Sequence, residues 1–239
     1  NHAFFYIMIA FFTGITAMVS EGLSFRGSDN LSVPILIILF LEIFLSKTAE
    51  GTVTEYLKVA FLIIFIFIIA YRKQSLTEDG LIGAIIMGLL IYGLGGYQYL
   101  VPLFIFFILS SILSHIIIIK PKNQYLSPRR NIIQVYSNGG IAMLLVIMDH
   151  FNPQPWIYPA FIASVTTAMA DTWGTEIGKL SSREPVDIIT FKSLKPGDSG
   201  GITVVGTIGT LFGAIVLGFV GYAFGIPEII TLLIILSGF

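Results

Sequence analysis

The sequence predicts an all-α bundle of membrane-spanning helices, and three observations support this fold class. The 239-residue chain is 55% hydrophobic with a mean hydropathy of +0.90, and only 11% of its residues are charged. A soluble domain of this size has too small an interior to bury that much apolar surface. The apolar residues also gather in runs close to the ~20 helical residues that cross a bilayer.

Nine such runs are expected to be transmembrane helices, the ninth of them cut short where the chain stops. They cover approximately residues 3–20, 31–46, 54–71, 80–97, 99–119, 131–149, 155–170, 202–224 and 228–239. Positive charge indicates their orientation, because loops rich in Lys and Arg remain in the cytoplasm. Eleven of the 13 Lys and Arg fall in alternate loops on one side, so loops 120–131 and 171–201 are predicted to be cytoplasmic.

We divide the chain into an N-terminal three-helix membrane segment, residues 1–71, and a core, residues 72–239. In the first part, Glu42 and Lys58 lie at similar depth in neighbouring runs. They are expected to pair, because charges inside a bilayer usually find a partner, and a proton or ion path is the alternative. The scattered histidines, such as His115 near the end of a run, are interpreted as interfacial residues rather than metal ligands.

Composition excludes several classes of function. The net charge is −1 and the basic residues are spread among loops, which argues against a nucleic-acid partner. The chain has no cysteine, so disulfides, cysteine zinc sites and thiol nucleophiles are excluded.

Small residues recur at helical spacing in two of the runs. Gly80, Ala84 and Gly88 repeat every four residues, and Gly206, Gly209 and Gly213 share one face of a later run. This spacing lets helices approach closely, so we expect a tight bundle around the polar loops.

Loop 120–131 contains Lys and Arg but no acid, and polar residues interrupt the apolar run that follows it. These polar residues are Gln134, Ser137 and Asn138. Membrane orientation and interhelical hydrogen bonds can explain both features without a function. The combination of Arg129, Arg130 and Asn138 favours a cavity.

The densest polar stretch, residues 171–201, holds nine charged residues between two apolar runs. Asp171 and Glu176 suit magnesium, which takes one or two carboxylates plus substrate phosphate oxygens. Five residues of an ideal helix turn by about 140°, so either the two carboxylates bind separate ions or the helix breaks near Gly174. After a break, Asp171 would cap a second short helix, and capping alone is its non-functional interpretation.

Two phosphate-binding features follow in the same stretch. Thr172, Glu176 and Lys179 share a helical face. They are interpreted as ligands of a magnesium-bound phosphate; the alternative is that Glu176 and Lys179 form an ordinary ion pair on the surface. The glycine-rich turn at 192–201 leads into a helix, whose free N–H groups bind anions, although it is not a Walker A sequence. The residues predicted to bind phosphate in this turn are Lys192, Lys195, Gly197, Ser199, Gly200 and Gly201.

Four stretches of the core resemble the phytyl-phosphate kinase family of tocopherol synthesis, which includes the transmembrane protein 19 group and prokaryotic integral membrane homologues. They are RKQSLTEDGLIGAIIMG at 72–88, RRNIIQVYSNGG at 129–140, ADTWGTEIGKLS at 170–181 and KSLKPGDSGGITVVGT at 192–207. Two departures stand out. Asp198 replaces a Thr of the family, and the family continues past Phe239, so the chain is expected to be C-terminally truncated and to lack one acidic site residue.

The resemblance implies an integral membrane kinase of the prokaryotic cell membrane. It would phosphorylate an isoprenoid monophosphate to the diphosphate, using magnesium and a nucleoside triphosphate, which is expected to be CTP. A phosphate acceptor is already anionic and needs no general base, which agrees with the lack of a catalytic histidine.

Each predicted site residue receives a role in this reaction. Asp171, Glu176 and Lys179 are assigned to catalysis, with the two acids as magnesium ligands. Thr172 and the 192–201 turn are assigned to the nucleotide phosphates. The acceptor phosphate is assigned to Arg129, Arg130 and Asn138, and the prenyl chain is expected to lie between the glycine-faced helices.

Three other functions remain open. A CTP-dependent cytidylyltransferase acting on a lipid phosphate would need the same residues. A membrane transporter would be expected to place ionisable residues near the bilayer midplane, whereas these acids lie at a membrane surface. A scaffold would use the charged stretch only as surface.

Overall fold

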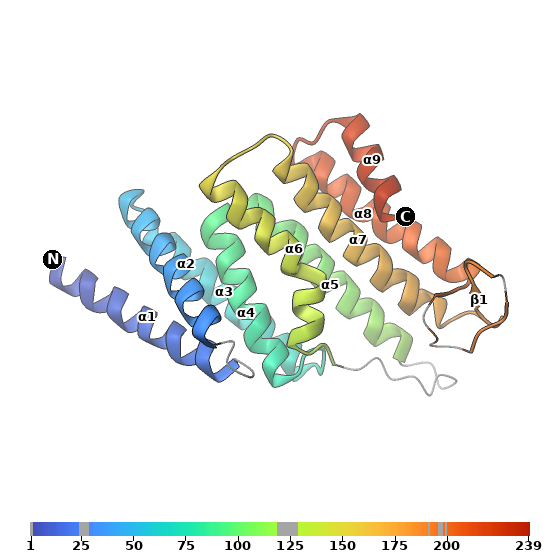
Figure 1. Ribbon diagram of the computed structural model, residues 1–239, viewed down its shortest axis with the longest axis horizontal. Coiled ribbons are helices and arrows are strands. Elements are labelled where there is room, and N and C mark those ends of the chain that lie inside the picture. Colours follow the sequence, from blue (N-terminus) through green and yellow to red (C-terminus); the bar gives the residue numbers. More distant parts are fainter. Residues whose placement is uncertain (1, 24–28, 119–128, 191, 196–197, 199) are drawn as a thin grey trace.

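The computed structural model describes residues 2–23, 29–118, 129–190, 192–195, 198 and 200–239. This part of the chain forms a row of helices and one pair of short antiparallel strands (Figure 1). In chain order they are α1 (His2–Leu23), α2 (Asp29–Ala49), α3 (Val53–Arg72), α4 (Glu78–Gly95), α5 (Tyr97–Ile118), α6 (Ile132–Phe151), α7 (Ile157–Gly178), β1 (Val186–Asp187), β2 (Gly201–Ile202), α8 (Val204–Ala223) and α9 (Glu228–Gly238). The prediction of an all-α bundle is confirmed.

Six of the described helices are long and apolar enough to cross a membrane, namely α2, α3, α4, α5, α6 and α8. The helix α7 is as long as α5, 22 residues, but its last two turns carry polar residues. A single glycine separates α4 from α5. This residue, Gly96, has φ 76°, a conformation that glycine adopts readily, so the chain reverses there at the end of α4.

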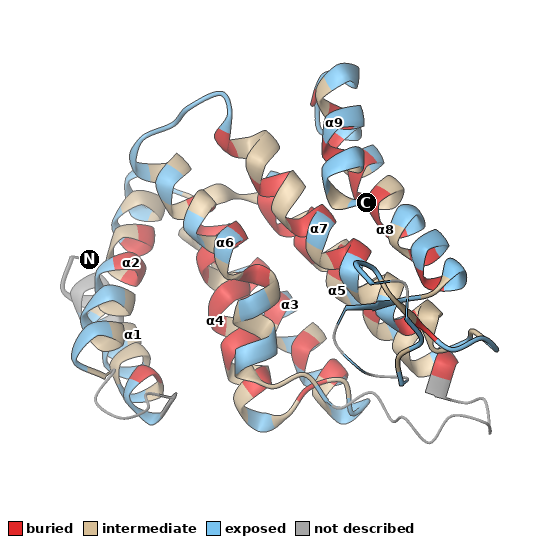
Figure 2. Cartoon of the chain, turned by 45° about the vertical axis from the view of Figure 1, so that its right-hand side comes forward, coloured by how far each residue is buried: buried red, intermediate tan, exposed pale blue. Residues whose placement is uncertain are grey.

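The helix α7 lies at the centre of one half of the bundle. It packs against α5, α6, α8 and α9, with Phe161, Val165 and Met169 fully buried. A second apolar core joins α2, α3 and α4 around Ile43 and Ile63. Figure 2 shows buried residues concentrated on α4 and α7, whereas α1 at the edge is largely exposed. The helix α7, which supplies several residues of the site described below, is therefore among the most enclosed.

The predicted close approach of helices through small residues is confirmed between α7 and α8. A Cβ added to Gly209 would lie 2.9 Å from the carbonyl oxygen of Trp173, and Gly206 and Gly213 face the α7 backbone in the same way. On α4, Gly88 faces the Ile63 side chain. Neighbouring helices fill these glycine faces, so the expectation that a prenyl chain lies between them is wrong.

We expect Gly209→Ala to lower the thermal stability of the protein, because its new Cβ would meet helix backbone, which cannot turn aside. Overpacking of this kind costs about 1–3 kcal/mol. The melting temperature of the detergent-purified protein measures the effect. Gly140→Ala on α6 is the control, since its Cβ would meet nothing within 4 Å. Equal melting temperatures for the two variants would contradict the tight contact between α7 and α8.

The half-buried acid of α2, Glu42, has a different partner from the one expected. Glu42 Oε1 lies 3.1 Å from Nε2 of His150 on α6, and the other ring nitrogen of His150 is 3.3 Å from the Leu94 carbonyl oxygen. Among the described residues, Lys58 makes no ion pair with Glu42, so the expected Glu42–Lys58 pair is wrong. His150 is a structural partner of Glu42 rather than a simple interfacial residue.

Candidate functional site

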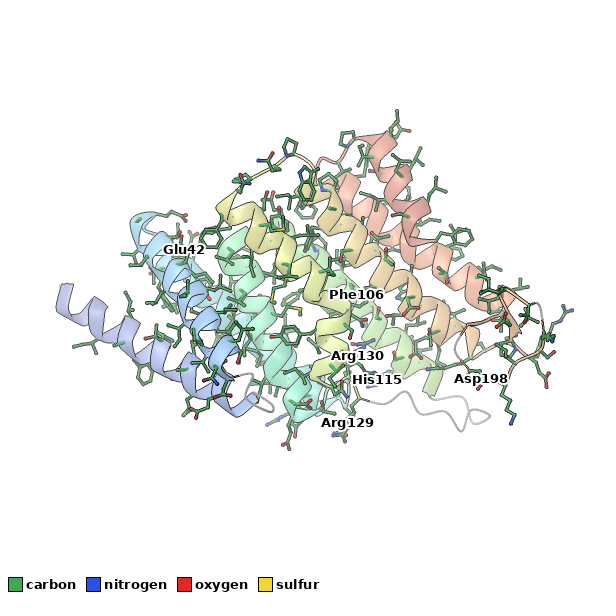
Figure 3. The ribbon with its side chains drawn as sticks, in the orientation of Figure 1. Glu42, Phe106, His115, Arg129, Arg130 and Asp198 are labelled. Atoms are coloured by element: carbon green, nitrogen blue, oxygen red, sulfur yellow. The ribbon has the colours of Figure 1, made fainter. Side chains whose placement is uncertain are left out.

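A polar pocket of about 810 Å³ opens at the end of the bundle where α3, α5 and α7 finish and α4 and α6 begin. Its volume falls in the range of ~300–1,000 Å³ that is usual for ligand sites. In Figure 3, Arg129, Arg130 and His115 lie together at this end, and Glu42 lies at the opposite end. The lining residues are Lys73, Gln74, Ser75, Ser111, Ser114, His115, Arg129, Arg130, Gln134, Ser137, Asn138, Asp171, Thr172, Thr175, Glu176 and Lys179.

Seven of the predicted site residues meet in this pocket, although they come from segments more than 30 residues apart in the chain. They are Arg129, Arg130, Asn138, Asp171, Thr172, Glu176 and Lys179. The predicted cavity beside Arg129, Arg130 and Asn138 is therefore present.

The helix α7 continues unbroken to Gly178, so the first eight residues of the supposed loop 171–201 are helical. The expected break near Gly174 and the N-cap role of Asp171 are both wrong. A Cβ on Gly174 would overlap the Thr210 hydroxyl of α8, so this glycine serves close packing and not a break. On an unbroken helix, Asp171 and Glu176 are about 140° apart in rotation and roughly 7.5 Å apart along the axis. The two carboxylates therefore leave α7 in different directions, and magnesium binding by either of them stays a prediction.

Glu176 and Lys179 form an ion pair within the pocket. Their Oε1 and Nζ atoms are 3.0 Å apart, and Glu176 is buried at 7% exposure. Glu176 and Lys179 thus form the ion pair that was the alternative interpretation, but the pair is half-enclosed and does not lie on an open surface. Asp171, by contrast, is exposed and lines the pocket.

Arg130 is half-buried between the polar pocket and the interior of the bundle. Its Nη1 donates to Ser111 Oγ at 2.9 Å, and its guanidinium carbon lies 5.9 Å from the centre of the Phe107 ring. Burial lowers the pKa of Arg130, and the nearby carboxylate of Glu176 raises it. Because an arginine stays protonated in proteins, the pocket keeps a fixed positive charge at this point.

The backbone of Arg130 is held by the link between α3 and α4. Its N–H donates to the Ser75 carbonyl at 3.0 Å, and its carbonyl accepts from Thr77 N–H at 3.1 Å, as part of a short parallel pairing of Leu76 with Arg130. Asp79 Oδ2 accepts from the Ile132 N–H at 3.0 Å, so an acid of α4 also fixes the start of α6. The stretch at 72–88 therefore fixes the position of Arg130, which belongs to the stretch at 129–140.

The first turns of α6 carry polar residues into the pocket. Asn131 caps the helix, accepting from Gln134 N–H at 3.0 Å, while Gln134 Oε1 accepts from Asn131 N–H at 3.1 Å. This reciprocal pair satisfies backbone donors that a helix start leaves free. Ser137 and Asn138 follow one turn later on the pocket side.

The described residues of the predicted phosphate turn do not line the pocket. Lys192, Lys195, Gly200 and Gly201 do not line it, and Gly197 and Ser199 fall outside the described residues. Asp198 Oδ2 accepts from the Lys195 N–H at 3.1 Å, so this acid stabilises its own turn. In Figure 3, Asp198 lies beyond the end of α7, away from Arg129 and Arg130. Phosphate binding by this turn stays a prediction.

Sequence reasoning missed seven of the sixteen described residues that line the pocket, namely Lys73, Gln74, Ser75, Ser111, Ser114, His115 and Thr175. His115 faces two carbonyl oxygens, Ser111 O at 2.8 Å and Lys73 O at 2.6 Å, so it ties the end of α5 to the end of α3. Ser111, Ser114 and His115 share one face of α5, and that spacing of polar residues was a usable signal.

The oxygen donors of the pocket meet part of what a magnesium ion requires. Among the described residues, no three His, Cys, Asp or Glu side chains gather into a group able to hold a metal alone. Magnesium, however, is commonly held by one or two carboxylates together with substrate phosphates and waters. Asp171, exposed in a pocket that also contains four basic residues, fits that requirement; Glu176 fits it only if its pair with Lys179 opens.

Comparison with known proteins gives matches over most of the chain. The family described as "Integral membrane protein DUF92" matches residues 61–239. Membrane protein MJ0933 of Methanocaldococcus jannaschii is 34% identical over 69% of this chain and 69% of its own length.

Two further relatives match over a similar region. Protein PGR of Arabidopsis thaliana is 30% identical over 66% of this chain and 60% of its own length. Membrane protein sll0875 of Synechocystis is 28% identical over 64% of this chain and 62% of its own length. No solved structure matches the chain.

Proposed function

Because the chain belongs to the DUF92 family of integral membrane proteins, and three of its four polar motifs line one pocket, we propose that it is a membrane phosphotransferase. It transfers the terminal phosphoryl group of a nucleoside triphosphate, with CTP as the expected donor, to an isoprenoid monophosphate. The substrate and cosubstrate follow from the resemblance of its four motifs to phytyl-phosphate kinases.

One observation carries the proposal: a single pocket at the end of the membrane helices contains two carboxylates and four cationic side chains. The cations are Lys73, Arg129, Arg130 and Lys179. A kinase that joins two phosphate-bearing substrates needs mainly positioning and neutralisation of charge, and this lining supplies both. The position of the pocket at a helix end suits a substrate with a polar head at the membrane surface and a chain in the bilayer.

The reaction needs no proton transfer by the protein. An oxygen of the acceptor phosphate attacks the γ-phosphorus, and the new P–O bond forms as the bond from that phosphorus to the β,γ-bridging oxygen breaks. The nucleoside diphosphate leaves with the negative charge. Cationic side chains that already point at the developing charge lower the barrier without reorganisation.

The pocket residues divide between the two substrates. Arg129, Arg130 and Asn138 hold the acceptor phosphate, because they line the side formed by α6 and its preceding loop. Thr172 on α7 and Lys179 just after its last residue face the nucleotide phosphates. Asp171 would hold magnesium, which neutralises phosphate oxygens when bound, and Glu176 orients Lys179.

Orientation and reaction are tested together in sealed membrane vesicles containing the full-length protein. With magnesium and phytyl or geranylgeranyl monophosphate, inside-out vesicles are expected to convert added CTP to CDP and the lipid to its diphosphate. Right-side-out vesicles should leave CTP intact, because the pocket end faces the cytoplasm. Each other nucleoside triphosphate is tried in turn.

The products distinguish the alternatives. Inorganic diphosphate together with a nucleotide-linked lipid identifies a cytidylyltransferase and rejects the kinase. No product with any triphosphate, in vesicles of either orientation, rejects phosphotransfer altogether.

A further inference from the structure

An apolar groove of about 370 Å³ lies between α3 and α5, directly beside the polar pocket. Its walls are Ile66, Ile69 and Ala70 on α3, and Phe107, Ile108 and Ile112 on α5. Three of these side chains are also open to the outside of the bundle: Ile69 is 42% exposed, Ile108 39% and Ile112 49%. The groove therefore opens sideways, toward the space that lipid chains occupy around a membrane helix.

The groove and the polar pocket are continuous. Four residues line both, namely Lys73, Ser75, Ser111 and His115. Arg130 sits at the junction, since it lines the polar pocket, donates to Ser111 and lies over Phe107 of the groove. A path thus leads from open hydrocarbon, along isoleucine side chains, to a half-buried positive charge.

We infer that this groove holds the hydrocarbon chain of the acceptor next to its phosphate, with Arg130 as the anchor of that phosphate. The occupant has a definite chemistry: a single-chain lipid phosphate monoester that enters from the bilayer. That this phosphate is the acceptor rests on the proposed function, whereas the path of the lipid chain rests on the junction at Arg130.

Such a groove orients the bound lipid and adds little to the affinity for it. A lipid chain is already in hydrocarbon, so moving it from the bilayer to isoleucine side chains gains little hydrophobic energy. Holding the first part of the chain fixes the direction of the phosphate relative to the nucleotide, and a misplacement of about 1 Å can cost about 100-fold in rate. The groove follows α5 from Ile108 to Ile116, about 12 Å of helix, so chain beyond that length lies free in the bilayer.

The test fills the groove with Ile112→Trp and compares two acceptors in detergent micelles. Turnover of phytyl monophosphate is expected to fall about 10-fold to 100-fold in kcat. Turnover of isopentenyl monophosphate, whose short chain barely enters the groove, should not change. Ile141→Trp on α6 is the matched control, because Ile141 is 60% exposed and lines neither cavity. Equal losses on both acceptors, or no loss on either, would overturn the inference.

A second measurement separates this inference from the proposed function. An alkyl monophosphate with a photoreactive diazirine close to its phosphate is irradiated with the wild-type protein, and the labelled peptides are identified. Labels on α3 and α5 support the groove even if no nucleotide is consumed, in which case only the proposed function fails. Labels confined to other helices in a protein that turns over phytyl monophosphate reject the groove and leave the function intact.

Discussion

Asp171→Asn is expected to abolish phosphoryl transfer, with kcat reduced at least about 100-fold, while the protein still folds and inserts. The substitution keeps the shape of the side chain and removes its charge. Asp171 is exposed in the pocket, so no packing is lost and no buried ion pair is broken. Losing one group that stabilises charge in the transition state costs about 10²–10³-fold in rate. Initial rates at saturating acceptor and nucleotide measure the effect.

The control for this variant is Glu184→Gln, which removes an exposed acid a short distance along the chain and outside the pocket. It should turn over at the wild-type rate. If Asp171 holds magnesium, the residual rate of Asp171→Asn should also need a higher magnesium concentration for half saturation. Unchanged turnover would refute the metal role of Asp171.

Gly80→Ala is expected to reduce turnover by about 100-fold, although this residue lines no part of the pocket. An added Cβ would overlap the carbonyl oxygen of Arg130, a backbone atom that cannot rotate away. That carbonyl is held by Thr77, and the Arg130 N–H by Ser75, so any shift of Arg130 also strains the α3–α4 link. Displacing the guanidinium removes the anchor for the acceptor phosphate. The KM for the acceptor and kcat, measured separately, report the change.

A double-mutant cycle shows whether Gly80→Ala acts through Arg130. Arg130→Ala should itself be severely impaired, and adding Gly80→Ala to it should cause little further loss, because coupled residues are not additive. Melting temperatures of all three variants exclude a general folding defect. If the turnover losses of the two single variants multiply in the double variant, Gly80 does not position Arg130.

Hydropathy predicted the helices well because a span must be apolar over a fixed length, whatever its neighbours. It failed at the end of α7, where the apolar run was placed at 155–170 but the helix continues to Gly178. Polar residues there keep their helical hydrogen bonds while they face a pocket, so polarity alone did not mark the helix end. The partner of Glu42 was missed for a related reason, since His150 is far away in the chain and reaches Glu42 only through the packing of α6.

The candidate site was predictable where motif residues are themselves charged. Asp171, Lys179 and Arg130 stand out in a chain with few charges, and all three meet in the pocket. Ser111 and His115 did not stand out, because single polar residues near the end of a span also occur at ordinary membrane interfaces. The role of Gly80 could not be read from the sequence at all, because close helix packing explains a glycine equally well.

The close packing of α7 against α8 limits which part of the pocket can move when the proposed substrates enter and leave. The backbone that carries Asp171 packs closely, through the glycines of α8, against that second membrane helix. This wall of the pocket is therefore rigid. If the pocket opens during a catalytic cycle, we expect the opposite wall to move. That wall consists of the short link at residues 73–77 and the end of α5. Hydrogen exchange should slow in that link when a lipid phosphate binds, and stay unchanged along the α7–α8 seam.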